Sequence, residues 1–296
     1  MPSEGVDRIE AIKPAMFHTT GIDGVYLRTE LFEQVTTALN DLITAHREPG
    51  TETLRFPPVM SRKTLETTGY AQNFPHMLGG VCCVDGSHAQ AGAGQEFDWA
   101  AHASTSDLVL TPAACYPVYP LAASRGAVPA AGLKFDVASD CFRREPSKRL
   151  DRLQTFRMRE YVCIGTGAQV LAFRERWQAR GGELAKQLGL SFRFESASDP
   201  FFGRMGQLLA QAQVEQGLKY ELLVPVYSQD QPTACMSFNY HMDHFGVTWR
   251  LTDSAGAPAH TGCAAFGLDR LALALFATHG VKLAMWPQGV RAALGV

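Results

Sequence analysis

The chain lacks the features of a secreted or membrane protein. Its first residues, MPSEGVDRIEAIKPA, include acidic side chains and no apolar core of the kind that a signal peptide contains. The most apolar stretch, 271–286, is broken by His279 and Lys282 and is too short to span a bilayer. Seven scattered cysteines are an odd number and do not form a secreted disulfide framework. These absences indicate a protein of the reducing cytoplasm without a membrane partner.

An excess of positive charge is also absent. Lys and Arg number 27 against 29 Asp and Glu, a net charge of -2, so the basic footprint of many nucleic-acid binders is missing. The sequence shows no repeats, no coiled-coil heptads and no HExxH motif, which disfavours an unrelated zinc hydrolase. A hydrophobic content of 46% is ample for a packed core, and 296 residues fit one large domain or two ordinary ones.

The order of predicted elements favours an α+β fold around an antiparallel sheet. Apolar spacing predicts a helix over 31–47, and paired prolines (Pro57, Pro58) place an edge strand in 51–61. Segment 61–84 predicts a short helix, a turn and a strand, and 85–104 a loop. Further strands are predicted in 107–112, 132–145, 155–165, 190–196, 219–228, 233–242 and 244–253. Further helices are predicted over 168–190, with a break at Gly181-Gly182, and over 203–216 and 267–279, the last helix.

Segment 142–161, FRREPSKRLDRLQTFRMREY, is rich in groups that bind nucleotides. Residues two apart on a strand face the same side, so Arg143 and Glu145 are expected to point into one site. Arg143 would pair with a phosphate and neutralise charge that builds up on it. The alternative is a basic hairpin with a solvated face.

Segment 267–276, GLDRLALALF, places Arg270 just inside a predicted helix that begins after Gly267. The free N–H groups of a helix N-terminus attract phosphate, and an arginine there would strengthen the attraction. The alternative is an ordinary amphipathic helix with Arg270 exposed.

Together these segments resemble motifs 2 and 3 of the class II aminoacyl-tRNA synthetases, and the helix, strand and prolines of 31–61 resemble motif 1. The resemblance spans roughly 30–280. Within it, 220–240 resembles the strand pair before motif 3 of seryl-tRNA synthetases, with Ser237-Phe238-Asn239 as its Ser-x-Asn element. The resemblance implies an antiparallel sheet flanked by helices, ATP as a substrate, and a homodimer formed through motif 1.

The resemblance also assigns roles to residues. It implies that Glu145 binds the adenine amino group, Phe156 stacks on adenine, and Arg152 and Arg270 reach the outer phosphates. The remaining expected nucleotide-binding residues are Leu153, Lys219, Ala234, Cys235, Met236 and Ser237. The alternative to a nucleotide-binding role for Lys219 is an ordinary surface lysine. Mg²⁺ is expected with ATP, but 233–237 offers no counterpart of the acidic residue that holds it in family members.

Three further positions resemble a metal site. Where common seryl-tRNA synthetases carry a Thr-x-Glu element, this chain has TPAAC, ending at Cys115; Glu160 closes motif 2, and Cys263 precedes motif 3. A zinc-dependent branch of seryl-tRNA synthetases uses Cys, Glu and Cys at these places. Two thiolates and a carboxylate suit a tetrahedral Zn²⁺ with one open position, which a substrate amino group can take. The alternative is two buried cysteines and a surface glutamate.

The chain resembles most the amino acid:[carrier protein] ligases, truncated homologues of the zinc-type seryl enzyme. About thirty residues precede motif 1, with no separate tRNA-binding domain among them, so tRNA is not the expected acceptor. The resemblance implies a single catalytic domain, 1–296, that activates a small amino acid, glycine or alanine, as its adenylate. The aminoacyl group would pass to the phosphopantetheine thiol of a small acyl-carrier-like protein.

Two details and two alternatives accompany this interpretation. Segment 181–220 is the candidate insertion for carrier docking and for covering the amino acid. Asp199 is a candidate contact for the substrate amine, with a turn or helix N-cap role as its alternative. The alternative functions are a seryl-type synthetase fragment that charges tRNA and a non-catalytic amino-acid sensor.

Overall fold

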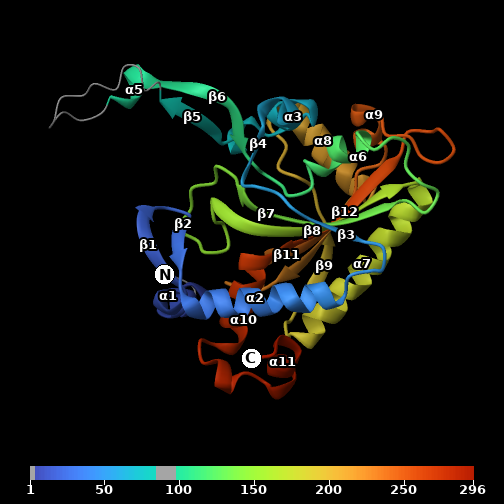
Figure 1. The fold of residues 1–296 in the computed structure, drawn as a ribbon. Helices are drawn as coiled ribbons and strands as arrows, with labels where there is room; N and C mark the ends of the chain where they lie inside the picture. The colour runs from blue at the N-terminus through green and yellow to red at the C-terminus, as the bar shows by residue number, and fades with distance from the viewer. Residues whose placement is uncertain (1–3, 85–97) are drawn as a thin grey trace.

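A seven-stranded sheet organises the protein in the computed structural model, which describes residues 4–84 and 98–296 (Figure 1). Its strands, in spatial order, are β3 (Glu52–Arg55), β7 (Leu133–Phe142), β8 (Thr155–Gly165), β12 (His260–Gly267), β11 (Thr233–Tyr240), β10 (Lys219–Val224) and β9 (Arg193–Ser196). Neighbouring strands are antiparallel except β3, which runs parallel to β7 at the edge. The predicted α+β class and the edge strand before the prolines are confirmed.

Two small sheets and a set of helices complete the described part. The small sheets are β1 (Phe17–Ile22) with β2 (Val25–Arg28), and β4 (Val59–Ser61), β6 (Ala103–Leu110) and β5 (Gly80–Val84). The helices are α1 (Glu4–Met16), α2 (Glu30–Ala45), α3 (Arg62–Thr67), α4 (Tyr70–Asn73), η1 (Pro75–Met77), α5 (Trp99–His102), α6 (Val118–Ala123), α7 (Gly167–Gln187), α8 (Gly203–Glu215), α9 (His244–Trp249), α10 (Leu268–His279), η3 (Leu283–Met285) and α11 (Gln288–Leu294). No helix among the described residues has the length and apolar character that crossing a membrane requires.

Helices α2, α7 and α10 cover one face of the large sheet and bury the main core against it. The Thr29 side chain caps α2 by accepting a hydrogen bond from the Phe32 N–H, and the apolar stripe of α2 faces inward. The Phe32 ring stacks on Phe276 of α10 with 5.9 Å between ring centroids. The helix predicted at 31–47 is therefore confirmed, because its apolar period matched one buried face.

Strand β8 separates the core from the opposite face, where the cavity lies. Arg159 points toward α2, is fully buried, and binds both carboxylate oxygens of Asp136 at 2.9 and 2.6 Å. The next residue, Glu160, points to the other face, because strand side chains alternate. The smaller helices α6 and α9 pack on that face in a second apolar cluster.

Two predictions near the C-terminus are wrong. Segment 244–253 is not a strand: its start forms α9, and the third strand of the run is β12 instead. The β-forming residues of HFGVTW were misleading because packing overrides local propensity; Phe245 is buried, and Gly246 lies against the backbone of Ala259. Helix α10 is also not the last, since η3 and α11 follow it.

The loop predicted at 85–104 is corrected in part. Residues 85–97 lie outside the described residues, whereas 98–104 contain α5 and the start of β6. Asp98 caps α5 by accepting hydrogen bonds from the N–H groups of Ala100 and Ala101. Beside this segment, β5 and β6 project from the body of the molecule (Figure 1).

The predicted break at Gly181-Gly182 is also wrong, because α7 continues through both residues. Gly181 instead permits close packing of the helix on the sheet: a Cβ there would lie 2.6 Å from Cζ of Phe238. The nearest atoms to a Cβ at Gly182 would be 3.5 Å away, in ordinary contact with the rings of Phe192 and Phe194.

Gly181→Ala is therefore expected to destabilise the protein by about 1–3 kcal/mol through overpacking. Gly182→Ala, the matched control, is expected to be neutral or stabilising by about 0.5–1 kcal/mol because alanine favours helix. Urea unfolding of both variants measures the difference. An equal change in the free energy of unfolding of the two variants would show that contact with Phe238 does not require glycine at position 181.

Candidate active site

A cavity of about 530 Å³ opens on the face of the sheet opposite α2 and α7, and the first turn of α10 contributes Asp269 and Arg270 to its lining. Strands β8, β10, β11 and β12 line it together with the loops that contain 113–116 and 143–153, the segment 199–201 and the inner side of α8. Its size is typical of a site for a small molecule or cofactor.

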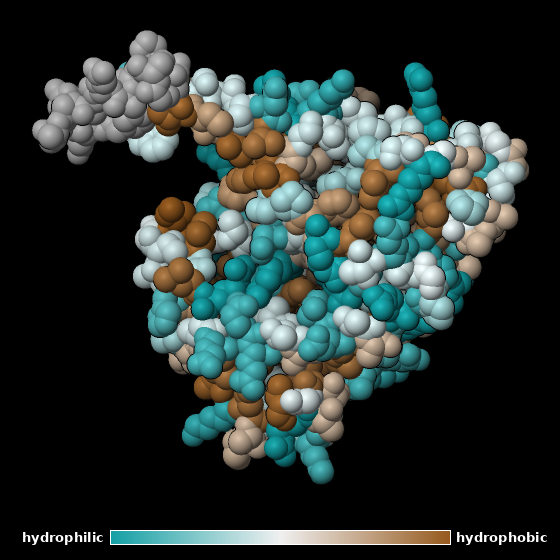
Figure 2. Space-filling model, in the orientation of Figure 1, coloured by the Kyte–Doolittle hydropathy of each residue, from teal (hydrophilic) through white to brown (hydrophobic). Residues whose placement is uncertain are grey.

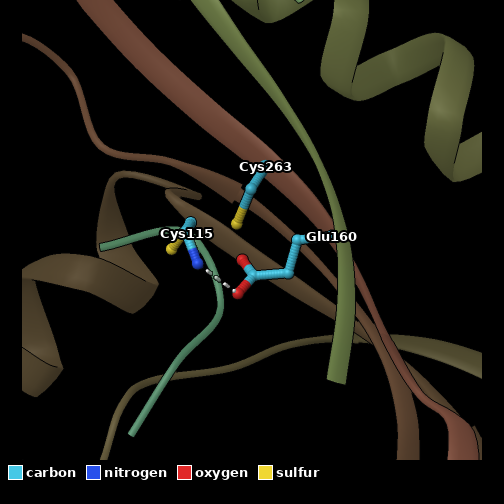
Figure 3. A group of neighbouring side chains, drawn as sticks. All are labelled: Cys115, Glu160 and Cys263. Carbon is cyan, nitrogen blue, oxygen red and sulfur yellow. Dashed lines mark hydrogen bonds between the residues drawn. The ribbon is translucent and has the colours of Figure 1, made fainter. Parts of the chain in front are cut away.

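Cys115, Glu160 and Cys263 all line this cavity and lie close to one another (Figure 3). Glu160 pairs with Ala265 and Cys263 with Val162 on the neighbouring strands β8 and β12, so both side chains lie on the cavity face. Cys115 comes from the loop after β6, and its backbone N–H donates to Oε1 of Glu160 at 3.0 Å. Glu160 is 2% exposed, so its alternative as a surface glutamate is wrong.

The donor set of this group fits a divalent metal ion. One ligand atom from each residue lies within 4.8 Å of the others. A tetrahedral Zn²⁺ with bonds of about 2.0–2.3 Å keeps its ligand atoms roughly 3.5 Å apart, so small side-chain rotations would suffice. The hydrogen bond with Cys263, burial and the charge of Glu160 all raise the pKa of Cys115 well above its usual range. A bound cation would reverse this, since thiols that bind zinc are deprotonated.

Two polar side chains lie beside Cys263. Nδ2 of Asn239 donates to its Sγ at 3.2 Å, and Nε2 of His241 lies 3.8 Å from the same sulfur. Nδ1 of His241 lies 3.1 Å from the hydroxyl of Thr261. Burial lowers the pKa of His241 to about 4, so the imidazole is neutral at pH 7. Sequence reasoning missed His241, although its spacing of two from Asn239 is a signal for a shared face.

Arg143 and Glu145 both line the cavity, but the reason predicted for this is wrong. Strand β7 ends at Phe142, and the Glu145 N–H donates to the carbonyl of Arg143 at 2.7 Å in a tight turn. The guanidinium of Arg143 lies over the ring of Phe156 at 5.4 Å, and its Nε donates to the carbonyl of Pro112. The turn, not strand alternation, directs the pair into the cavity.

Arg270 also lines the cavity, so its alternative as an exposed residue of an amphipathic helix is wrong. Its guanidinium donates to the carbonyls of Asp151 at 2.8 Å and Ala234 at 3.0 Å. Arg152 does not appear in the cavity wall: its side chain is 59% exposed and lies 3.7 Å from Glu145. The other expected nucleotide-binding residues line the cavity: Leu153, Phe156, Lys219, Ala234, Cys235, Met236 and Ser237.

Lys219 and Asp199 form an ion pair in the cavity wall, with Nζ and Oδ1 2.7 Å apart. Lys219 is 8% exposed, so it is not a surface lysine. Asp199 does not cap a helix, because α8 begins at Gly203 after an N-cap at Phe202.

Sequence reasoning also missed several cavity residues that come from distant segments: Tyr70, Tyr116, Asp151, Glu221 and Phe245.

Comparison with known proteins identifies curated relatives. No protein-family model matches the chain. Amino acid–[acyl-carrier-protein] ligase 1 of Bradyrhizobium diazoefficiens is 59% identical over 295 residues, covering 98% of this chain and 90% of that protein. Ligase 2 of the same organism is 56% identical, covering 98% and 88%. The type-2 serine–tRNA ligase of Methanopyrus kandleri is 28% identical over 194 residues, covering 62% of this chain and 37% of the relative.

Solved structures share the fold. M. kandleri SerRS, in complex with A. aeolicus tRNASec, superposes with a TM-score of 0.82 at 20% identity, covering 99% of this chain and 60% of that one. Seryl-tRNA synthetase from Pyrococcus horikoshii, complexed with ATP, gives a TM-score of 0.70 at 16% identity, covering 100% and 63%. The chain thus spans about 60% of the length of these synthetases.

The sheet and the helices that flank it have the fold of the class II aminoacyl-tRNA synthetases. The 59% identity over nearly the whole length goes further: the chain belongs to the family of amino acid–[acyl-carrier-protein] ligases. It is therefore an enzyme, a ligase, and the non-catalytic sensor is set aside.

Proposed function

We propose that the protein activates glycine or alanine with ATP as an aminoacyl-adenylate and transfers the aminoacyl group to the phosphopantetheine thiol of a carrier protein. The observation that carries this proposal is a single cavity that is lined by the Cys115–Glu160–Cys263 group and by Arg143, Phe156 and Arg270. The names of the two most similar curated relatives given above support the carrier protein as acceptor.

The two ends of the cavity would divide the chemistry. A zinc ion on Cys115, Glu160 and Cys263 would supply a Lewis acid that binds the substrate amino group. Arg143 would stabilise negative charge on the α-phosphate, and Arg270 would bind the outer phosphates. Phe156 offers a face for adenine, with Glu145 beside it as acceptor for the adenine amino group.

Mg²⁺ would accompany ATP in this scheme. Glu221 of β10 lines the cavity. It pairs with Ser237 of the neighbouring strand β11, the strand that lacks the acidic residue expected to hold Mg²⁺. We expect Glu221 to share in holding Mg²⁺, because carboxylate oxygens are the ligands that this ion prefers.

Aromatic side chains beside Cys115 favour a small amino acid. The Tyr119 ring stacks on Phe245 with 4.0 Å between centroids, and Phe245 meets His241 at 5.2 Å. Tyr116 and Phe245 both line the cavity there. Such a wall leaves room for a short side chain next to the metal group, which supports glycine or alanine as substrate.

Helix α8 is the proposed docking site of the carrier. The structure places 181–187 in α7 and 193–196 in the large sheet, so the proposed insertion narrows to the segment around α8. Five large apolar residues are exposed there: Phe202 (58%), Met205 (69%), Leu208 (57%), Leu209 (43%) and Val214 (42%). Leu209 and Ala212 also line the cavity. A carrier bound to α8 would therefore hold its prosthetic arm next to the cavity.

Amino-acid-dependent pyrophosphate–ATP exchange tests the activation step. The purified protein is assayed with all twenty amino acids, with and without a zinc chelator. Chelator-sensitive exchange with glycine or alanine is the expected result, and transfer to a carrier protein but not to tRNA is expected next. Exchange with no amino acid, in protein that contains zinc, would overturn the proposal; transfer to tRNASer would favour the seryl-type fragment.

Met205→Glu is expected to lower transfer to the carrier at least tenfold while pyrophosphate exchange stays unchanged, because a charge would occupy the centre of an apolar contact. Met285→Glu is the matched control, since Met285 is 76% exposed in η3, at the opposite end of the molecule from α8 (Figure 1). Equal transfer by both variants would place the carrier on another surface.

We also propose that the protein forms a homodimer, as the resemblance to motif 1 implies. Ile22 and Leu27 on the β1–β2 hairpin are 58% and 60% exposed. Figure 2 shows hydrophobic atoms over this hairpin and along the projecting β5–β6 arm. A self-association surface on this side would cover them.

A further inference from the structure

Gln213 links helix α8 to the cavity wall through a pair of hydrogen bonds. Its Oε1 accepts from the backbone N–H of Asp199 at 2.6 Å, and its Nε2 donates to Oδ2 of Asp199 at 2.9 Å. One side chain therefore holds both the backbone and the carboxylate of Asp199. Both residues line the cavity.

Asp199 is held from its other side by the sheet. Lys219, at the start of β10, donates to Oδ1 of Asp199 at 2.7 Å and lies 3.1 Å from a carboxylate oxygen of Glu221. Burial by itself would raise the pKa of Asp199, but the charge of Lys219 and the hydrogen bond from Gln213 outweigh it and lower the pKa. Asp199 and Glu221 thus surround one ammonium group with two carboxylates.

Helix α8 itself has few other attachments. Gly206 is its one buried residue, and most of its side chains are exposed. At its ends, the Phe202 N–H donates to the carbonyl of Asn73, and the Leu218 N–H donates to the carbonyl of Gln213. A segment with so little burial has low local stability, so its order depends strongly on each remaining contact.

We propose that Gln213 is a positioning residue that couples the order of α8 to the binding of the amino acid beside Asp199. This inference rests on the proposed function, in which the amino acid is activated in this cavity and the carrier docks on α8, and on Asp199 as the candidate contact for the substrate amine. Binding of the adenylate beside Asp199 would stabilise this hydrogen-bonded arrangement and, through Gln213, the helix α8. By thermodynamic reciprocity a carrier that orders α8 would then strengthen amino acid binding.

Hydrogen exchange on the intact protein tests this coupling without the carrier. The probes are glycyl- and alanyl-sulfamoyl adenosine, which are stable analogues of the adenylate. In the wild type, the tighter-binding analogue is expected to slow exchange of the α8 amides about tenfold, within the usual 5–150-fold range of allosteric coupling. In Gln213→Leu, which removes both hydrogen bonds at similar volume, α8 protection should no longer respond.

Gln211→Leu is the matched control, because Gln211 lies on α8 but bonds only Glu215 among its described side-chain contacts, and its response should equal that of the wild type. Gln213→Asn, with its shorter amide, serves if Gln213→Leu does not fold. Analogue binding by calorimetry separates the two proposals. Binding without any change at α8, or an unchanged response in Gln213→Leu and Gln213→Asn, overturns the coupling alone. Failure of both analogues to bind overturns the proposed function with it.

Discussion

Replacing Cys115 with alanine is expected to abolish zinc retention and adenylate formation together. The three candidate ligands are buried and face one another, so loss of one thiolate leaves two donors, too few for a stable zinc site. The loss of a ligand should exceed the 10–100-fold cost typical of residues that only support ligands. Zinc content by atomic absorption and pyrophosphate exchange on the same preparation measure both effects.

Cys163→Ala is the control for this prediction. Cys163 is as buried as Cys115 but lies in the main core, on the face of the sheet covered by α2 and α7. Its variant should retain one zinc per chain and full exchange activity, with at most a loss of stability. Normal activation by metal-free Cys115→Ala protein would refute the zinc role.

Arg270→Ala is expected to lower the rate of pyrophosphate exchange about 10²–10³-fold while zinc content stays unchanged, because one preorganised charge on the phosphates is removed. The carbonyls of Asp151 and Ala234 orient the guanidinium, so its fork is fixed before ATP binds. Arg270→Lys should recover only part of the rate, since lysine keeps the charge but not the fork. Exchange kinetics at varied ATP, with zinc analysis, measure this.

Arg62→Ala is the matched control, because Arg62 is a 47%-exposed surface arginine that pairs with Asp107. It should leave exchange unchanged. If Arg270→Ala protein lost its zinc, the separation of the cavity into a metal end and a phosphate end would be wrong.

Segments with a single strong period were predicted well from the sequence. The stripe of apolar residues in α2 matches one buried face, and the continuous apolar run of α10 matches a helix that is buried on nearly all sides, so local pattern and packing agree. The residue types of the site could also be predicted from the sequence, since thiols, carboxylates and arginines have few functions at these motif positions. That these residues lie close together depends on the register of the strands, which no local sequence pattern shows.

Segments whose structure depends on distant partners were predicted poorly. α9 contains β-forming residues, yet it is a helix whose Phe245 stacks on Tyr119 of α6 and whose Gly246 lies against the backbone of Ala259. Gly181 looked like a helix break, but its missing Cβ accommodates Phe238, 57 positions away. Local propensity is worth less than about 1 kcal/mol per residue, and burial of one aromatic ring outweighs it.

The sequence by itself determined the fold class and the chemical groups of the candidate site, because periodicity and residue type are local properties. Only the tertiary structure decided that Glu160 is buried beside two thiols, that His241 and Asn239 lie against Cys263, and that Gln213 holds Asp199. These contacts join segments far apart in the chain. Their geometry follows from the register of antiparallel strands and the packing of helices on them, which no single segment encodes.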